Sequence, residues 1–475
     1  MNAAPAQLAL WLLLVLPAGV GGVLALARPR RGAAVLSVAT ASVTAVLSVV
    51  VALSRPSASS PFLPVVPGGE FAIGVDGLSA LMVAMIAVVT LLVLLFSCGD
   101  PETQESPGRF HGLMLLFAAA ALLTATAQTL PALLLGWEVM GAMSFALIGF
   151  RWQEGRRVSA GTTAFLTTRV ADLGLYVAAA AALAGGAGLV VADLPVASAG
   201  WRDVLAAGVL VAALGKAAQL PFSFWLSRAM EGPSPVSALL HSAAMVAMGG
   251  YLLLRAHPLL AATGWASGTA AWIGALTALV LGVVAVGQRD LKQLLAASTS
   301  AQLGFVVLGA GLGATAGATA HLLAHAATKA ALFLAAGAWL TALGTKDLAG
   351  LRGVARRWRV LGWSATIAAL SLAGVAPLAL WATKDAVLAV ALERSPGLAA
   401  VGLAAAALSA AYAGSILVAV WSRVTAQDRD EVASHRGRER PGTGHVGALE
   451  QAPLVVLALG AAGLGVLALP RSATP

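Results

Sequence analysis

The stretch LGKAAQLPFSFWLSRAMEGPSPVSALLH, residues 214–241, places Lys216 in an otherwise apolar run, with Pro221 five residues later. A lysine ammonium inside a hydrocarbon layer costs several kcal/mol, so such residues mark functional sites. Proline removes a backbone donor and kinks or interrupts a helix, and irregular backbone at membrane depth is tolerated only beside protein or water. The stretch therefore predicts a membrane helix that is broken beside a buried, functional lysine.

The composition of the whole chain indicates a polytopic membrane protein. Of its 475 residues, 59% are hydrophobic and 10% are charged, whereas about a quarter of a soluble domain is charged. Apolar stretches of about twenty residues, each enough to cross a bilayer as a helix, recur from end to end. The sequence predicts an all-α fold of about 14 transmembrane helices, near residues 7–27, 32–53, 76–97, 112–128, 130–150, 162–188, 203–225, 235–256, 268–287, 293–313, 318–343, 361–392, 396–422 and 450–469.

The positive charge is distributed as a topology signal. The formal net charge is +9, and 20 of the 29 Lys and Arg residues fall in loops that follow odd-numbered spans. Basic loops stay in the cytoplasm, so both termini are expected outside it, in a multi-pass protein of the cell inner (plasma) membrane. Because topology accounts for the charge, nucleic acid is not an expected partner.

The sequence carries no sign of a cofactor. The single cysteine, Cys98, cannot form an internal disulfide or hold an iron–sulfur cluster within this chain, since a cluster needs about four thiolates. GAGLGA, residues 309–314, has the form of a dinucleotide fingerprint but follows a predicted membrane helix instead of a strand. No cofactor and no redox active site are therefore expected in this chain.

Two predicted spans contain a proline near a lysine. Pro221 follows Lys216 in the seventh span, and Pro377 precedes Lys384 in the twelfth. Interruptions five spans apart predict two inverted five-helix repeats, with helices 7 and 12 broken. The expected organisation is N-terminal helices 1–3 in residues 1–110, the first repeat in 111–260, the second in 265–422, a cytoplasmic linker in 423–449 and a C-terminal helix in 450–475.

Ten ionisable side chains lie inside the predicted spans, where an isolated charge is costly and should face the helix bundle or a hydrated cavity. Static ion pairs that hold helices together are one interpretation. A proton relay accounts better for ten groups spread over spans five to twelve. The ten residues are Glu138, Arg169, Asp172, Lys216, His241, His321, His325, Lys329, Lys384 and Asp385.

Glu138 has apolar neighbours on both sides, and Lys216 is the natural candidate for its ion-pair partner. A carboxylate near an ammonium favours the charged form of each, so moving it away lowers the proton affinity of the lysine. Arg169 and Asp172 are three residues apart on one helix face. They are expected as a modulating ion pair that supplies a second, competing partner for Glu138.

HLLAHAATKAALF carries His321, His325 and Lys329 at positions i, i+4 and i+8 of one helical stripe. Imidazoles titrate near neutral pH and donate and accept at once, so the stripe is a candidate proton wire. Metal binding is the weaker alternative, because the pattern is not HExxH and no third ligand lies nearby. His241 closes the opening stretch just beyond the break, which favours a place in the relay over a packed core histidine.

Lys384 and Asp385 lie toward the outer end of the twelfth predicted span. An exit gate for protons is expected there, with Asp385 as a gate candidate. Snorkelling of Lys384 to the membrane interface is the alternative.

These segments resemble the antiporter-like subunits of respiratory complex I and the related cation/proton antiporters. The opening stretch resembles the family signature, and five further segments match in order over about residues 70–420: WEVMGAMSFALIGF, TRVADLG, QRDLKQLLAASTSAQLGF, HLLAHAATKAALFLAAG and TKDAVL. The chain is most similar to the large distal L-type subunit of NADH-quinone oxidoreductase.

The resemblance implies fourteen helices with two inverted five-helix repeats, and it implies roles position by position. Glu138 resembles the modulating glutamate of the fifth helix, Lys216 the central lysine of the seventh, and Lys384 the lysine of the second broken helix. Arg169 and Asp172 resemble the ion pair beside that glutamate. The residues that resemble the hydrated central axis are His241, His321, His325 and Lys329.

The expected function is that of a proton-translocating membrane subunit of an NADH:quinone oxidoreductase-like complex, which couples redox energy released elsewhere to proton transfer along buried Glu, Lys and His residues. The expected partners are protons, the lipid bilayer, and other membrane subunits of such an assembly or a peripheral enzyme. Two alternatives are a proton- or sodium-coupled membrane partner of a bicarbonate-accumulating complex with a soluble zinc protein, and a Na+/H+ antiporter subunit.

Two departures from the L-type pattern keep these alternatives open. L-type subunits usually extend further than Pro475, through a long lateral helix and a final anchor. The acidic residue that usually precedes AMEGP is replaced by Arg228 in WLSRAM.

Overall fold

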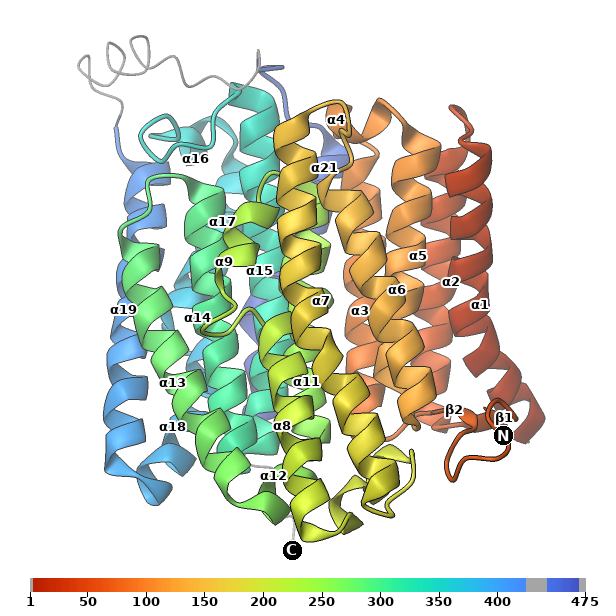
Figure 1. Cartoon of the computed structure of the whole chain (residues 1–475). Helices are drawn as coiled ribbons and strands as arrows, with labels where there is room; N and C mark the ends of the chain where they lie inside the picture. Colours follow the sequence, from red (N-terminus) through yellow and green to blue (C-terminus); the bar gives the residue numbers. More distant parts are fainter. Residues whose placement is uncertain (1–2, 424–441, 470–475) are drawn as a thin grey trace, which may run out of the picture. The chain divides into compact units, whose positions relative to one another are not determined.

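The computed structural model describes residues 3–423 and 442–469. The chain divides into two compact units, unit 1 (Met1–Thr269) and unit 2 (Ala270–Pro475), which can be followed by colour along the chain in Figure 1. Helix α13 (Trp265–Val286) crosses the boundary between them. Most of the predicted cytoplasmic linker, residues 424–441, lies outside the described residues.

Unit 1 consists of long helices that run side by side (Figure 1). The long helices are α1 (Ala3–Ala27), α2 (Ala33–Ser54), α3 (Gly77–Ser97), α5 (Pro107–Thr126), α6 (Leu130–Ile148), α7 (Gly155–Ala184), α8 (Ala199–Lys216) and α11 (Met245–Arg255). Shorter helical segments are α4 (Pro101–Gln104), η1 (Val191–Val196), α9 (Phe224–Ala229), α10 (Ser234–Ala238), the π-helical turn η2 (Leu239–Ala243) and α12 (His257–Thr263).

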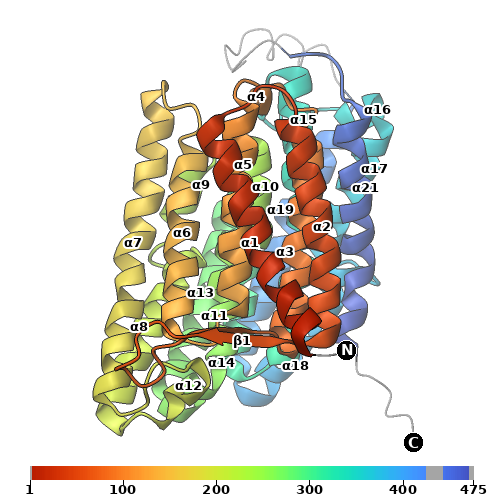
Figure 2. The same cartoon turned by 90° about the vertical axis from the view of Figure 1, so that its right-hand side faces the viewer.

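A small β-hairpin follows α2. Strands β1 (Ser57–Ser60) and β2 (Phe71–Gly74) pair antiparallel, with Ser57 opposite Gly74. The hairpin lies beside the start of α1 (Figure 2), where the Gln7 side chain donates a hydrogen bond to the Ser57 carbonyl at 3.0 Å. Asp76 then starts α3 as its N-cap, because its carboxylate accepts from the Ser79 backbone N–H at 2.8 Å.

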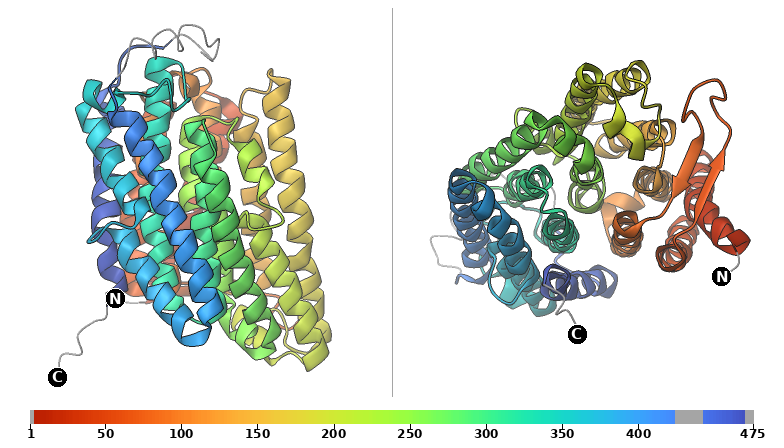
Figure 3. Two further views of the ribbon diagram at one scale, coloured as in Figure 1. Left: turned by 90° about the vertical axis from the view of Figure 1, so that its left-hand side faces the viewer. Right: turned by 90° about the horizontal axis from the view of Figure 1, so that it is seen from below.

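Unit 2 contains α14 (Leu291–Leu312), α15 (Thr315–Leu343), α16 (Val354–Arg357), α17 (Arg359–Ala373), α18 (Ala379–Arg394), α19 (Pro396–Trp421), α21 (Ala448–Gly463) and η3 (Leu464–Ala468). Figure 3 shows these helices from the side and from below. Helix α15 packs against α14, α17, α18 and α21, so its side chains are buried around nearly its whole circumference. A helix buried on all faces is the natural place for polar groups that must be kept from lipid.

Within the described residues, twelve helices are long and apolar enough to cross a membrane. The two predicted spans outside this set are 203–225 and 361–392, and both are interrupted where the prolines predict. The first stops at Lys216 and resumes with α9 at Phe224. The second stops at Ala373 and resumes with α18 at Ala379. The broken helices are therefore confirmed, while the count of fourteen spans and the inverted repeats stay predictions.

Candidate functional site

Lys216 lies in a wholly enclosed site of unit 1. Its side chain is 0% exposed and its ammonium donates to Asp172 Oδ2 at 2.8 Å, where the Asp172 side chain is 2% exposed. Trp137 completes the site, because its indole Nε1 donates to Asp172 Oδ1 at 2.6 Å and its ring lies 5.1 Å from the ammonium. The Trp137 carbonyl also accepts from Lys216 at 3.4 Å. Each charge therefore has hydrogen-bond partners, which a buried ion pair needs to offset its desolvation.

The break in the seventh span places the lysine. Lys216 is the last residue of α8, where the carbonyl end of the helix dipole favours a cation. The Trp225 indole donates to the Gly215 carbonyl at 2.9 Å, so one carbonyl released by the break is satisfied. Close packing of α7 on α8 then brings Asp172 within reach, since a Cβ on Gly215 would lie 2.2 Å from the Ala171 Cβ.

The ion pairs differ from the sequence prediction in their partners. Lys216 pairs with Asp172 and not with Glu138, and Glu138 pairs with Arg169. Arg169 and Asp172 therefore do not pair with each other. Glu138 follows the buried Trp137 on α6, and consecutive helical residues point about 100° apart, so Glu138 faces outward when Trp137 faces the lysine. The expected competing partner for Glu138 is present in Arg169.

The Glu138–Arg169 pair lies on the outer side of α6 and α7. The two side chains are 24% and 36% exposed, and the Tyr176 hydroxyl donates to Glu138 Oε1 at 3.0 Å. Arg169 is at the middle of the 30-residue α7. Charged side chains are thus partly uncovered halfway along a helix of membrane length.

His241 lies in the π-helical turn η2, buried at 0% exposure. Its ring meets that of Trp225 edge-on, with the ring centroids 5.9 Å apart. Trp225 therefore touches both the broken end of α8 and the histidine. Single π turns inside helices are frequent at functional sites.

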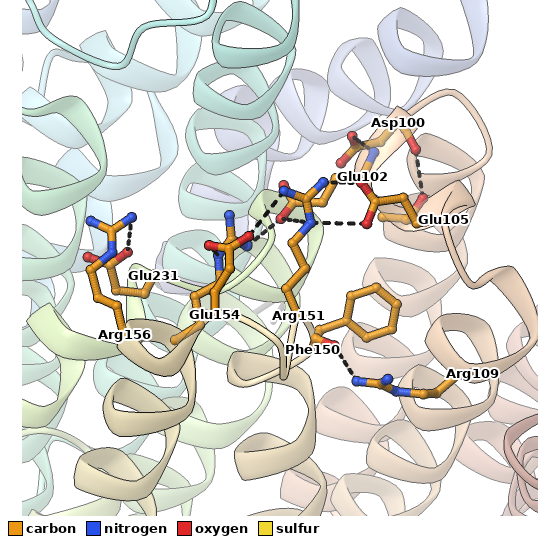
Figure 4. A network of polar contacts seen from close by, with 11 residues as sticks. Asp100, Glu102, Glu105, Arg109, Phe150, Arg151, Glu154, Arg156 and Glu231 are labelled. Atoms are coloured by element: carbon orange, nitrogen blue, oxygen red, sulfur yellow. Dashed lines mark hydrogen bonds and ion pairs between the residues drawn. The ribbon is translucent and has the colours of Figure 1, made fainter. Parts of the chain in front are cut away.

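A network of charges fixes the loop between α6 and α7 (Figure 4). Glu102 of α4, whose side chain is 4% exposed, pairs with Arg151 at 3.6 Å and with Arg157. On the other side of the loop, Arg156 pairs with Glu231 at 3.2 Å, which joins the start of α7 to the segment between α9 and α10. The network ties together the helices that carry Glu138 and Asp172, and nothing in the sequence spacing indicated it.

In unit 2, α15 carries His321, His325 and Lys329, each 0% exposed. The Lys329 ammonium donates to the Leu295 carbonyl of α14 at 3.1 Å and to the Ser298 hydroxyl. His321 Nδ1 lies 2.9 Å from the Thr383 hydroxyl of α18. The predicted stripe is therefore buried, and its end nearer the N-terminus of α15 reaches the residue that precedes Lys384.

Lys384 and Asp385 have opposite environments. The Lys384 ammonium is enclosed and donates to the Leu372 carbonyl at 2.8 Å and to the Ser409 hydroxyl at 2.6 Å, whereas Asp385 is exposed. Lys384 therefore does not snorkel. Residues 374–378, between α17 and α18, leave the Leu372 carbonyl near the end of α17 available to the lysine.

Three contact residues of the lysines were missed from the sequence, namely Trp137, Ser298 and Ser409, and so was Thr383, the partner of His321. Tryptophan, serine and threonine are ordinary in membrane helices, so their positions alone carry no signal. For the metal alternative, no group of three or more His, Cys, Asp or Glu side chains arranged to hold an ion occurs in residues 3–423 and 442–469.

The fold and the site define a class: polytopic helical membrane proteins with interrupted helices and lysines buried beside the interruptions. The sequence model described as "NADH:quinone oxidoreductase/Mrp antiporter, TM" matches residues 127–409. The chain belongs to this family, and the resemblance read from the sequence is confirmed.

Individual relatives agree with that assignment. The chain is 30% identical over 425 residues to NAD(P)H-quinone oxidoreductase chain 5 of Picosynechococcus sp., covering 83% of this chain and 64% of that protein. It is 34% identical over 330 residues to NADH-quinone oxidoreductase subunit L of Mycobacterium tuberculosis, covering 68% and 52%. The chain thus spans a little over half the length of the curated relatives it matches.

Two solved structures have the same fold. The Mrp complex from Dietzia sp. matches with a TM-score of 0.84 and 28% identity, over 95% of this chain and 49% of that one. Respiratory complex I from Thermus thermophilus matches with a TM-score of 0.81 and 26% identity, over 97% of this chain and 98% of that one. The all-α fold of an antiporter-like membrane subunit is therefore confirmed.

Proposed function

We propose that the chain is a proton-translocating membrane subunit of an NADH:quinone oxidoreductase-like complex, in which redox energy released in other subunits drives proton transfer through buried Glu, Lys and His residues. The observation that carries the proposal is the enclosed Lys216–Asp172 pair at the broken end of α8. A buried ion pair is weak evidence for stability by itself, so a lysine retained at a helix break favours a functional role.

The chemistry assigned to unit 1 is protonation switching. Asp172 favours the ammonium form of Lys216, because a nearby opposite charge favours ionisation. Burial of the pair acts in the other direction and favours the neutral forms. A shift of α7 against α8 that lengthens the 2.8 Å contact releases the proton. Arg169 modulates this shift through Glu138, since α7 carries both Arg169 and Asp172 while α6 carries both Glu138 and Trp137.

The route assigned to unit 2 follows α15. Lys329, His325 and His321 succeed one another at intervals of four residues, which is about 6 Å along a helix. An imidazole accepts a proton on one nitrogen while donating from the other, so protons pass along this stripe to Thr383 and Lys384. Asp385, exposed one residue further on, is the candidate for the gate to water.

Membrane subunits are proposed as the partners of the chain. The Glu138–Arg169 pair is partly uncovered at the middle of α7, and charges facing lipid at that depth cost several kcal/mol. A neighbouring subunit that covers the outer face of α6 and α7 removes this cost. We place the chain in the cell inner (plasma) membrane with both termini outside the cytoplasm, on the distribution of its basic loops.

A second candidate is a Na+/H+ antiporter subunit, which is favoured by the likeness to the Mrp complex. The two functions are separated by purifying the tagged chain with its partners in mild detergent and reconstituting the complex in vesicles. For the leading proposal we expect proton uptake that depends on NADH and quinone and persists without sodium. Sodium-dependent exchange without redox subunits favours the second candidate, and no proton movement under either condition contradicts both.

A further inference from the structure

Two of the buried lysines of unit 2, Lys329 and Lys384, donate to the same kinds of acceptor. Lys384 donates to the Leu372 carbonyl and to the Ser409 hydroxyl, at 2.8 and 2.6 Å. Lys329 donates to the Leu295 carbonyl at 3.1 Å and to the Ser298 hydroxyl. Both serine side chains are wholly buried. One backbone carbonyl and one serine hydroxyl thus recur at two independent positions of the unit.

Neither lysine has an acidic partner among residues 3–423 and 442–469. In the described part of unit 2, no Asp or Glu oxygen lies within 4.0 Å of either ammonium, whereas Lys216 of unit 1 contacts Asp172 at 2.8 Å. A carboxylate strongly favours the protonated lysine, while a hydroxyl is a neutral acceptor that also stays satisfied when the amine is neutral. The serine therefore hydrogen-bonds the ammonium but also permits the neutral amine of the lysine.

Ser409 is itself positioned by further contacts. Its hydroxyl donates to the Ala406 carbonyl at 2.8 Å, which leaves its lone pairs to face Lys384. The Tyr412 hydroxyl, one turn along α19, interacts with the side chains of Ser409 and of Gln302 on α14, the latter at 2.5 Å. These buried polar groups fix the position of the Ser409 oxygen that accepts the hydrogen bond from Lys384.

We propose that Ser409, and in the same way Ser298, are positioning residues that fix a buried lysine of unit 2 while keeping its proton exchangeable. The inference rests on the proposed function and adds to it the reason why these lysines can release what they bind. An acidic residue in place of either serine makes the lysine hold its proton more tightly. A residue without the hydroxyl makes the lysine bind its proton more weakly.

Helices α14, α15, α17, α19 and α21 pack against α18. Of their titratable groups, His321 and Lys329 of α15 are near enough to Lys384 to interact electrostatically with it, and Tyr412 of α19 interacts with Ser409. His325 is buried on α15, and Glu450 accepts from the Gly447 N–H at the N-terminus of α21. Asp385 on α18 itself is exposed. Ser409→Asp therefore places a carboxylate in direct contact with this ammonium, where the described residues supply none.

The test compares Ser409→Asp, Ser409→Ala and Ser409→Thr in the reconstituted complex, by measuring proton flux across a range of pH. For Ser409→Asp we expect a flux at least about tenfold lower at neutral pH and a half-maximal pH raised by about 1 to 3 units, the effect of a nearby opposite charge. For Ser409→Ala the half-maximal pH moves down, and for Ser409→Thr, which keeps the hydroxyl, the profile stays close to that of the wild type. Ser364→Ala is the matched control, since Ser364 is a buried serine of α17 that contacts neither lysine.

Opposite shifts for the aspartate and alanine variants support the positioning role, because a purely structural defect lowers flux without moving the profile in opposite directions. If Ser409→Asp does not assemble, Ser409→Ala and Ser298→Ala decide: a downward shift in both supports the inference and an unmoved profile overturns it. Lys384→Met separates this inference from the proposed function. Flux retained in Lys384→Met contradicts the function, whereas flux lost there with unmoved profiles in the serine variants contradicts only the role of the serines.

Discussion

Lys216 of unit 1 and Lys384 of unit 2 each lie beside an interrupted helix, but their surroundings differ in charge. Lys216 contacts the carboxylate of Asp172 and the ring of Trp137. Lys384 contacts a carbonyl, a hydroxyl and, at 5.8 Å, the ring of Phe305. The first lysine is half of a buried ion pair, whereas the second donates to neutral acceptors.

An interrupted helix can therefore support two kinds of buried lysine site. An interrupted helix supplies carbonyls and a dipole end that tolerate a cation at membrane depth. The neighbouring helices differ in the group that they present to the lysine, which is a carboxylate on α7 in one unit and a serine on α19 in the other. Four variants, at Lys216, Lys384, Glu138 and Asp76, distinguish the two sites by how much flux and stability each change removes.

Lys216→Met is expected to abolish proton flux and to destabilise the protein by about 3 to 5 kcal/mol, because it leaves the Asp172 carboxylate buried without its partner. Flux is measured in reconstituted vesicles, and stability by thermal unfolding in detergent. The control is the double variant Lys216→Met/Asp172→Asn, which should recover most of the stability and none of the flux. Unchanged flux in the single variant would falsify the central assignment.

Lys384→Met is expected to abolish flux at a cost of only about 1 to 2 kcal/mol in stability, since it leaves one buried carbonyl, that of Leu372, without a donor and strands no charge. The same two measurements apply. A loss of stability as large as that of Lys216→Met contradicts the comparison, because it shows that Lys384 also balances a buried negative charge.

Glu138→Gln is expected to slow flux roughly fivefold at most and to leave assembly intact. The Glu138–Arg169 pair is partly exposed, and pairs of that kind contribute about 1 kcal/mol or less, which corresponds to that change in rate. The measurement is flux at neutral pH beside the wild type. Complete loss, or no loss, argues against a modulating role for the glutamate.

The smallest effect is expected at Asp76, at the start of α3, whose carboxylate is 52% exposed and pairs with Arg255 at 2.9 Å. Burial opposes its ionisation, but the Ser79 N–H and Arg255 together hold the pKa of Asp76 below its usual value. The folded pKa is lower than the unfolded one, so the stabilisation is present above the unfolded value near 3.8 and is lost as the pH falls through the folded value. Because the pair is exposed, this amounts to less than about 1 kcal/mol.

Asp76→Asn should therefore lower the thermal stability slightly at pH 7, and this loss should become smaller below pH 3.8, when unfolding is followed at pH 7 and at about pH 3. If Asp76→Asn loses as much stability at pH 7 as Lys216→Met does, then the exposed Asp76–Arg255 pair contributes as much as the buried Asp172–Lys216 pair, and the difference in exposure has no energetic consequence. Equal small losses at both pH values point to the hydrogen bonds of the cap instead of the charge.

The buried groups of the site were largely predictable from the sequence, and their partners were not. A lysine or histidine inside an apolar run must be enclosed, and Lys216, His241, His321, His325, Lys329 and Lys384 are all buried. Which carboxylate meets which cation depends on how each helix is turned about its axis. Trp137 takes the inward position on α6, so Glu138 faces outward to Arg169 and leaves Asp172 for Lys216.

The sequence alone determined that this is a helical membrane protein, where two of its helices break, and which family it resembles. These follow from local rules, because apolar length sets a membrane span and proline removes a backbone donor. The ion pairs, the network around Glu102 and the serines that accept from Lys329 and Lys384 became evident only from the packed helices. Contacts between helices far apart in the chain depend on the rotation and close approach of the packed helices, which no single stretch of sequence records.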